Sequence, residues 1–86
     1  MELMHVLLAL QKGKTRATYG AVAGLLGGSA RSIMKGRPRD PLHSWVVSKQ
    51  TGMPSGYEED QRHEDLLSNS RVIEDPEALE AYLEKH

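Results

Sequence analysis

The chain of 86 residues contains no cysteine and no phenylalanine, and its aromatic residues are three tyrosines and one tryptophan. The lack of cysteine excludes disulfides, thiolate zinc sites and a cysteine nucleophile. It also fits a reducing compartment, so we expect a cytoplasmic protein. Because phenylalanine is absent, leucine, valine, methionine and alanine must fill the core of the one small domain that this length predicts.

Long hydrophobic runs are also missing. The apolar run of residues 3–10 is too short to span a bilayer. Glu2 stands where a secretory signal would have positive charge, and no small-residue cleavage site follows the run. We therefore expect no membrane partner, and we interpret the run as a buried helix from Glu2 to Gln11 with Gly13 just past its end.

The chain has almost no net charge, since its formal charge is −1. Its acidic and basic residues are nevertheless distributed unevenly along the sequence. Residues 1–50 contain eight basic and two acidic residues, whereas residues 51–86 contain three basic and ten acidic residues. Such asymmetry indicates an anionic partner for the basic half. Small domains also often segregate charge, so on charge alone both interpretations stay open.

The first half of the chain has the pattern of a helix pair. Residues 19–26 place apolar side chains at the spacing of a core-facing helix, and the Thr18 hydroxyl can cap its start. A double glycine ends this helix, and Ser29 can cap a further helix from Ala30 to Lys35. A helix, a tight glycine turn and a second helix form the helix-turn-helix arrangement.

The second half predicts shorter elements. Residues 44–48 are β-branched and aromatic, which favours a strand, and an extended partner near Met53 would complete a wing. The acidic residues 58–67 predict a polar helix, and residues 70–74 a short strand. Asp75-Pro76 is typical of a helix start, an Asp cap followed by proline in the first turn.

Together these elements predict a fold that is mainly α with a small β element, a helix-turn-helix (winged-helix-like) domain. Residues 1–86 are expected to form a single domain. Within it, residues 1–57 would contain the helix-turn-helix and the wing, and residues 58–86 an acidic C-terminal helical segment.

The order of several short motifs is similar to that of one protein family. Over residues 3–57 the chain resembles the DNA-binding domain of the methylated-DNA–protein-cysteine methyltransferases and the alkyltransferase-like proteins. Twelve residues fit the first part of the family pattern in order: Val6, Ala9, Leu10, Gly13, Thr18, Tyr19, Gly20, Val22, Ala23, Gly27, Ala30 and Arg31. The rest of the pattern is matched more loosely by Pro41, Val46, Val47, Gly56 and Tyr57.

The resemblance implies a protein that binds double-stranded DNA, including alkylated DNA, and recognises modified or distorted bases by nucleotide flipping. In the family, an arginine at the position of Arg31 fills the gap left by the extruded nucleotide, and a tyrosine at the position of Tyr19 crowds the adjacent phosphate. Extrusion costs stacking energy, so a group that occupies the gap favours it. The family's cysteine aligns with His43 or, in another alignment, with Leu42. Neither side chain can accept an alkyl group in the family's manner, so we expect no enzyme activity.

The basic residues of the first half and two capping hydroxyls are the expected DNA contacts. The predicted DNA-binding residues are Tyr19, Arg31, Thr18, Ser29, Lys35, Arg37, Arg39, Lys14 and Arg16. A candidate base pocket consists of His43, Trp45 and Tyr57. Trp45 has two interpretations, a stacking platform for a base or a core anchor, and the second is favoured. The four histidines lack ligand spacing, so no metal site and no cofactor are expected.

The alternative function is that of a protein-interaction module that keeps the fold without binding DNA lesions. Its partner would dock on the acidic C-terminal segment, residues 58–86. That partner could be another chain or the basic half of a second copy.

Overall fold

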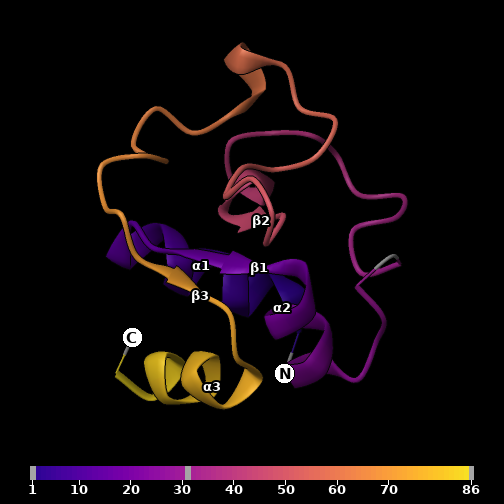
Figure 1. Ribbon diagram of the computed structural model, residues 1–86, viewed down its shortest axis with the longest axis vertical. Helices are drawn as coiled ribbons and strands as arrows, with labels where there is room; N and C mark the ends of the chain where they lie inside the picture. The colour runs from indigo at the N-terminus through magenta and orange to yellow at the C-terminus, as the bar shows by residue number, and fades with distance from the viewer. Residues whose placement is uncertain (1, 31, 86) are drawn as a thin grey trace.

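The computed structural model describes residues 2–30 and 32–85, which form a mixed α/β fold (Figure 1). The α-helices of this part of the chain are α1 (Leu3–Gly13), α2 (Tyr19–Leu26) and α3 (Pro76–Lys85). The strands are β1 (Arg16–Thr18), β2 (Val46–Val47) and β3 (Val72–Ile73). Two short 3₁₀ helices, η1 (His43–Trp45) and η2 (Glu59–Gln61), lie in the long connection between β1 and β3.

Local capping signals set the starts of two helices as predicted. The Thr18 hydroxyl oxygen accepts a hydrogen bond from the backbone N–H of Ala21 at 3.1 Å, which caps α2. The Asp75 carboxylate accepts one from the backbone N–H of Glu77 at 2.9 Å at the start of α3. Within the described residues, no helix is both long enough and apolar enough to cross a membrane.

α1 ends two residues later than predicted. Gly13 is the last residue of the helix, and Lys14 takes the left-handed conformation with φ 49°. Close packing requires glycine at position 13, because a Cβ atom there would overlap the hydroxyl of Tyr82. That hydroxyl donates to the backbone carbonyl of Ala9 at 2.7 Å, so α3 is held against the end of α1.

The sheet is parallel, with the strand order β2-β1-β3. Ala17 of β1 lies opposite Val46 on one side and Ile73 on the other. Each neighbour of β1 reaches it after a long connection, as parallel pairing requires. The predicted strand near residues 70–74 is therefore confirmed as β3, and it ties the acidic end of the chain to the first half.

The predicted wing is wrong for the described residues. Val46–Val47 pairs with β1 instead of with a strand near Met53, and Met53 meets this region through one backbone bond, Ser48 N–H to the Met53 carbonyl at 3.0 Å. Gly52 has a positive φ of 71°, so the chain turns sharply before Met53. This turn returns the chain to Ser48, but the residues around Met53 form no strand.

The expected helix from Ala30 to Lys35 is also absent, since residues 30 and 32–36 form turns. One helical turn closes where the Ile33 N–H donates to the Ser29 carbonyl at 3.0 Å. A six-residue segment followed by Gly36, with φ 76°, and Pro38 cannot extend that turn. Arg31 lies outside the described residues.

The predicted polar helix over residues 58–67 is replaced by η2 and further turns. The backbone N–H of Glu58 donates to the side chain of Gln61 at 2.7 Å, which closes one turn only. Seven of the ten residues in this segment are acidic or apolar, and their side chains are spread along an irregular path on which Leu66 alone is buried. A regular helix would place the like charges of Asp60 and Glu64 four residues apart on one face, which is destabilising.

One hydrophobic core joins both halves of the chain. Trp45 and Val46 are fully buried beside Leu7, Leu10 and Leu79. The favoured interpretation of Trp45 as a core anchor is therefore confirmed. α3 lies against α2 in Figure 1, at the opposite end of the molecule from η2.

Candidate nucleic-acid interface

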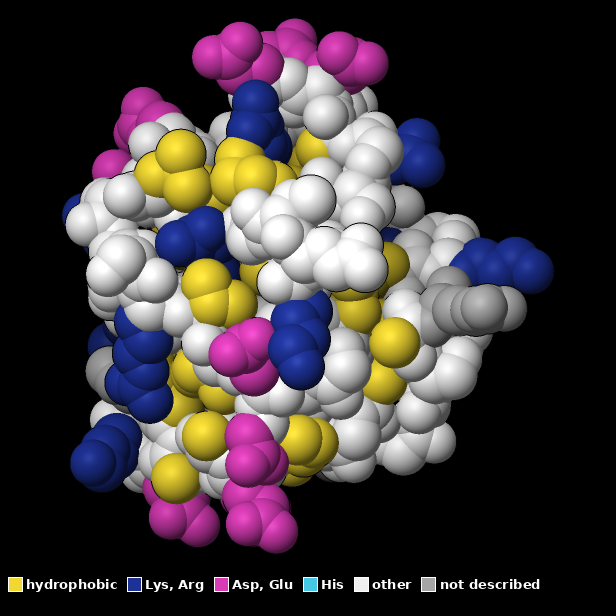
Figure 2. Space-filling view, viewed as in Figure 1, with side chains coloured by type: hydrophobic (Ala, Val, Ile, Leu, Met, Phe, Trp, Pro, Cys, Tyr) yellow, Lys and Arg dark blue, Asp and Glu magenta, His cyan; other side chains and the backbone are white. Residues whose placement is uncertain are grey.

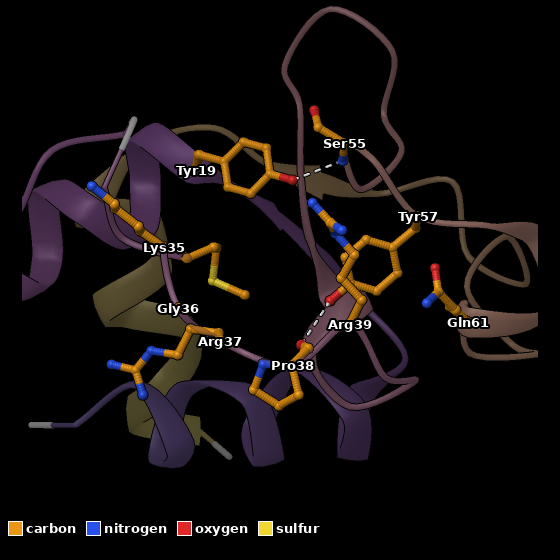
Figure 3. Close-up of a pocket in the computed structure, with 10 residues that line it drawn as sticks. Tyr19, Lys35, Gly36, Arg37, Pro38, Arg39, Ser55, Tyr57 and Gln61 are labelled. Atoms are coloured by element: carbon orange, nitrogen blue, oxygen red, sulfur yellow. Dashed lines mark hydrogen bonds between the residues drawn. The ribbon is translucent and has the colours of Figure 1, made fainter.

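A cleft of about 520 Å³ lies between the start of α2, the segment after it and the loop before η2. We call it the tyrosine cleft. Figure 3 shows the ring of Tyr19 on one side of the cleft and that of Tyr57 on another, with the segment of Lys35 to Arg39 along its edge. Its lining residues are Tyr19, Met34, Lys35, Gly36, Arg37, Pro38, Arg39, Ser55, Tyr57 and Gln61.

Tyr19 is positioned by the capped start of α2. It is the first residue of the helix, directly after the buried cap Thr18, so its backbone is fixed. Its hydroxyl oxygen accepts a hydrogen bond from the backbone N–H of Ser55 at 2.8 Å. This bond joins two segments that are distant in the sequence, and it leaves the half-buried ring directed into the cleft (Figure 3).

Tyr57 is held across the cleft by a longer contact, because its hydroxyl donates to the backbone carbonyl of Pro38 at 3.4 Å. Burial raises the pKa of Tyr57 to about 12, and the nearby charge of Asp40 acts in the same direction. The phenol therefore stays neutral at physiological pH. The cleft keeps a hydrogen-bond donor there and gains no negative charge.

The basic lining residues Lys35, Arg37 and Arg39 are all exposed. Figure 3 shows the charged ends of Lys35 and Arg37 directed away from the centre of the cleft, whereas Arg39 extends beside the ring of Tyr57. The Arg39 guanidinium passes so close to Gly56 that a Cβ atom there would lie 3.2 Å from its Nη2 atom. The described lining residues include no acidic one.

The acidic side chains of the visible face gather elsewhere. In Figure 2 they lie mostly at the two ends of the long axis, over the segment around η2 and over α3, and basic side chains lie mostly between them. The charge asymmetry of the sequence thus becomes a spatial separation, which concentrates positive potential along the middle of this face.

His43 and Asp40 form a pair behind the cleft rather than in it. His43 Nδ1 lies 2.6 Å from Asp40 Oδ1, and the His43 backbone N–H donates to the same oxygen at 2.9 Å. Burial acts to raise the pKa of Asp40, but the hydrogen bonds and charge of His43 outweigh it and lower that pKa. Asp40 thus bonds both the backbone and the ring of His43, whose side chain is buried.

The predicted base pocket is therefore mostly wrong. Of its members only Tyr57 lines the tyrosine cleft, because η1 directs both His43 and Trp45 into the core. The ring of Trp45 instead lies 4.9 Å from that of His63. Leu42, the other position aligned with the family's cysteine, is half-buried and packs against the core.

Two basic residues predicted to contact DNA serve the fold instead. Arg16 is buried in β1, and its guanidinium donates from Nη1 to the Gly52 carbonyl at 2.6 Å and from Nη2 to the Asn69 carbonyl at 3.2 Å. Lys14 Nζ lies 3.4 Å from a carboxylate oxygen of Asp65. Arg16 is thus inaccessible to DNA, and the Lys14 charge is partly neutralised.

The two hydroxyls predicted as phosphate contacts are also engaged. The buried Thr18 hydroxyl caps α2, which leaves it without access to DNA. The hydroxyl of Ser29 is exposed and lies 2.8 Å from that of Ser32, but Ser29 does not line the tyrosine cleft. Arg31, the predicted gap-filling residue, lies outside the described residues.

Sequence reasoning missed Met34, Ser55 and Gln61 as lining residues. Ser55 acts through its backbone N–H, which any residue but proline would supply, so its side chain gave no signal. Gln61 was hidden in the predicted acidic helix. The turn sequence Pro54-Ser55-Gly56 was the available signal that the chain bends back before Tyr57.

Comparison of the chain with protein-family models, with curated proteins and with solved structures found no match. In the part of the chain that the structure describes, no three histidine or acidic side chains form a group that could hold a metal ion. The geometry and charge of the tyrosine cleft are what support a function.

Proposed function

We propose that the protein is a non-enzymatic DNA-binding protein and that the tyrosine cleft is its contact with DNA. One observation supports this most strongly. Four of the nine predicted DNA-binding residues line this one cleft, together with Tyr57 of the predicted base pocket, although they come from separate segments: Tyr19, Lys35, Arg37 and Arg39.

The chemistry of the cleft suits a nucleotide in two ways. Lysine and arginine side chains bind phosphate oxygens, and the outward ends of Lys35 and Arg37 can meet a backbone that passes along the rim. The neutral rings of Tyr19 and Tyr57 offer aromatic faces, on which bases stack with about 1–3 kcal/mol each. A phosphate and its base can therefore be held together.

The resemblance to the alkyltransferase-like proteins suggests which feature of DNA the cleft recognises, namely a modified or distorted base. Recognition of a modified or distorted base requires that the base leave the stack, and the cleft is large enough to receive a nucleotide. In this proposal α2 and the turns that follow it, in place of a second helix, present Tyr19 and Lys35 to the duplex.

Fluorescence anisotropy with a labelled duplex, with and without an alkylated guanine, tests the proposal. Three cleft cations that neutralise three phosphates would make affinity fall about 40-fold between 50 and 200 mM salt. Lys35→Gln should weaken binding, whereas Lys85→Gln is the matched control, since Lys85 is an exposed lysine that does not line the cleft. Absence of binding at low salt would overturn the proposal.

A second candidate is the protein-interaction module. Met4 and Leu8 lie four residues apart on α1 and are 45% and 52% exposed, which gives the helix an uncovered apolar pair. α3 buries Leu79, Tyr82 and Leu83 and leaves its acidic residues outward. A pull-down whose captured partner persists after nuclease treatment, and is lost with Leu8→Lys, would favour this function.

A further inference from the structure

A second cleft, of about 490 Å³, lies beyond the carboxyl ends of the parallel strands, where ligands of open parallel sheets characteristically bind. We call it the strand-end cleft. Thr18 ends β1, Ser48 follows β2 and Glu74 follows β3. Its lining residues are Thr18, Tyr19, Gly20, Ala30, Ser48, Lys49, Glu74 and Pro76.

Tyr19 is shared by both clefts. Because its hydroxyl is bonded to the Ser55 N–H, the side chain forms a bridge between α2 and the loop of residues 51–56. Gly20, beside it on the strand-end side, has open space where a Cβ would project, apart from the Thr18 hydroxyl at 4.0 Å. The two clefts therefore adjoin at Tyr19.

We infer that an unpaired strand of nucleic acid runs through both clefts across Tyr19, a proposal that rests on the proposed function. Phosphates lie at Lys35 and Arg37 at one end of this path and at Lys49, exposed in the strand-end cleft, at the other. A base between them lies on the Tyr19 ring. Phosphate contacts on both sides of a stacking side chain are what sequence-tolerant single-strand binding requires.

The strand must be unpaired because of where Tyr19 lies. Its ring is half-buried between two concave surfaces, and the bases of an intact duplex are enclosed in their own stack. A duplex must therefore lose stacking before a base reaches the ring, whereas a single strand does not. This predicts that single-stranded DNA binds at least roughly tenfold more tightly than an intact duplex of equal length.

Glu74 is the acidic lining residue of the strand-end cleft, and it opposes a phosphate there. Lys49 and Glu74 have opposite charges, so their substitutions should change the affinity for single-stranded DNA in opposite directions. Lys49→Gln should reduce single-strand affinity and make the log–log salt slope shallower by about 0.7, the value for one phosphate contact on a single strand. Glu74→Gln should raise affinity roughly two- to fivefold.

The experiment is anisotropy with labelled oligothymidylates of about two to ten nucleotides and a matched intact duplex. The Lys49→Gln effect should appear with the longer oligomers and vanish with the dinucleotide, which fits one cleft. Lys85→Gln should leave every affinity unchanged. Circular dichroism confirms that each variant is folded.

Two substitutions separate the Tyr19 ring from its hydroxyl. Tyr19→Phe removes the bond to Ser55 but keeps the aromatic face, so single-strand affinity should stay within about threefold. Tyr19→Leu removes the face, and affinity should fall about tenfold. Equal losses in both variants would contradict a base that stacks there.

The outcomes distinguish the two proposals. If the duplex binds as tightly as the single strand while Lys35→Gln still weakens both, the single-strand path is overturned and DNA binding at the tyrosine cleft stands. If Lys49→Gln changes neither affinity nor salt slope, the path through the strand-end cleft is overturned. If no DNA binds, both proposals fail.

Discussion

At the scale of single residues, Arg16 shows how burial changes the role of a charge. Its guanidinium is enclosed beneath the loops that contain Gly52 and Asn69 and donates to both backbone carbonyls. A hydrogen bond from a charged donor contributes about 1.5–3 kcal/mol, and a lost donor leaves a carbonyl unpaired. Arg16 therefore fastens two loops of the long connection to β1.

Arg16→Met keeps most of the apolar stem and removes both bonds, so we expect the free energy of unfolding to fall by about 2–3 kcal/mol. Urea denaturation measures this change. Lys14→Met is the control, because an exposed ion pair such as Lys14–Asp65 contributes about 0–1 kcal/mol. Equal losses in the two variants would contradict the structural role of Arg16.

Tyr57 makes a prediction about pH. Because burial raises its folded-state pKa to about 12, the stability that Tyr57 contributes is fully present below pH 10.0, the ordinary value, and is lost as the pH rises through about 12. Tyrosinate absorbance in the parent minus that in Tyr57→Phe should therefore titrate with a midpoint near 12. A midpoint near 10.0 would show that the phenol is not shielded in the cleft.

At the scale of elements, the contact between the end of α1 and α3 depends on the absence of one side chain. A Cβ atom at Gly13 would overlap the Tyr82 hydroxyl and displace it from the Ala9 carbonyl. Overpacking of this kind costs about 1–3 kcal/mol. Gly13 is therefore required for packing and not for a left-handed backbone, which Lys14 adopts instead.

Gly13→Ala should therefore lower the free energy of unfolding by about 2 kcal/mol, measured by urea denaturation. Tyr82→Phe removes the overlapping atom, so the alanine should cost much less in the Tyr82→Phe background. The two substitutions must be non-additive in this double-mutant cycle. Additive losses would place the Tyr82 hydroxyl away from Gly13.

Elements with local signals were predictable, and those that depend on distant partners were not. The caps Thr18 and Asp75 fixed two helix starts because each bonds a backbone N–H two or three residues away. No residue near Val46–Val47 indicates that the partner strand is β1, some 30 residues earlier in the sequence. Local sequence alone therefore favoured pairing with the next extended segment, as an antiparallel wing. Residues 30–35 include residue types that favour a helix, but the segment is too short to form a stable one.

The same distinction applies to the site. Tyr19, Arg37 and Tyr57 were predicted and do line the tyrosine cleft, because residue type and local turns were enough to place them on the surface. His43 and Arg16 were predicted as contacts and are buried. Their burial depends on η1 and on loops far along the chain, which residue type does not reveal.

At the scale of the whole molecule, the parallel sheet explains how a chain with net charge −1 gathers most basic side chains of one face between two acidic ends (Figure 2). β3 brings the acidic second half onto β1, and α3 and η2 then hold their acidic residues at opposite ends of the long axis (Figures 1 and 2). The tyrosine cleft lies between them. The uneven distribution of charge along the sequence thus becomes a separation of acidic and basic side chains in space.

The most direct test of DNA binding at the tyrosine cleft is a map of backbone amide NMR shifts on addition of a short DNA at low salt. The proposal predicts the largest changes at Tyr19, at residues 34–39 and at residues 55–57. Changes confined to α3 and to residues 58–67, or no change at all, would contradict it.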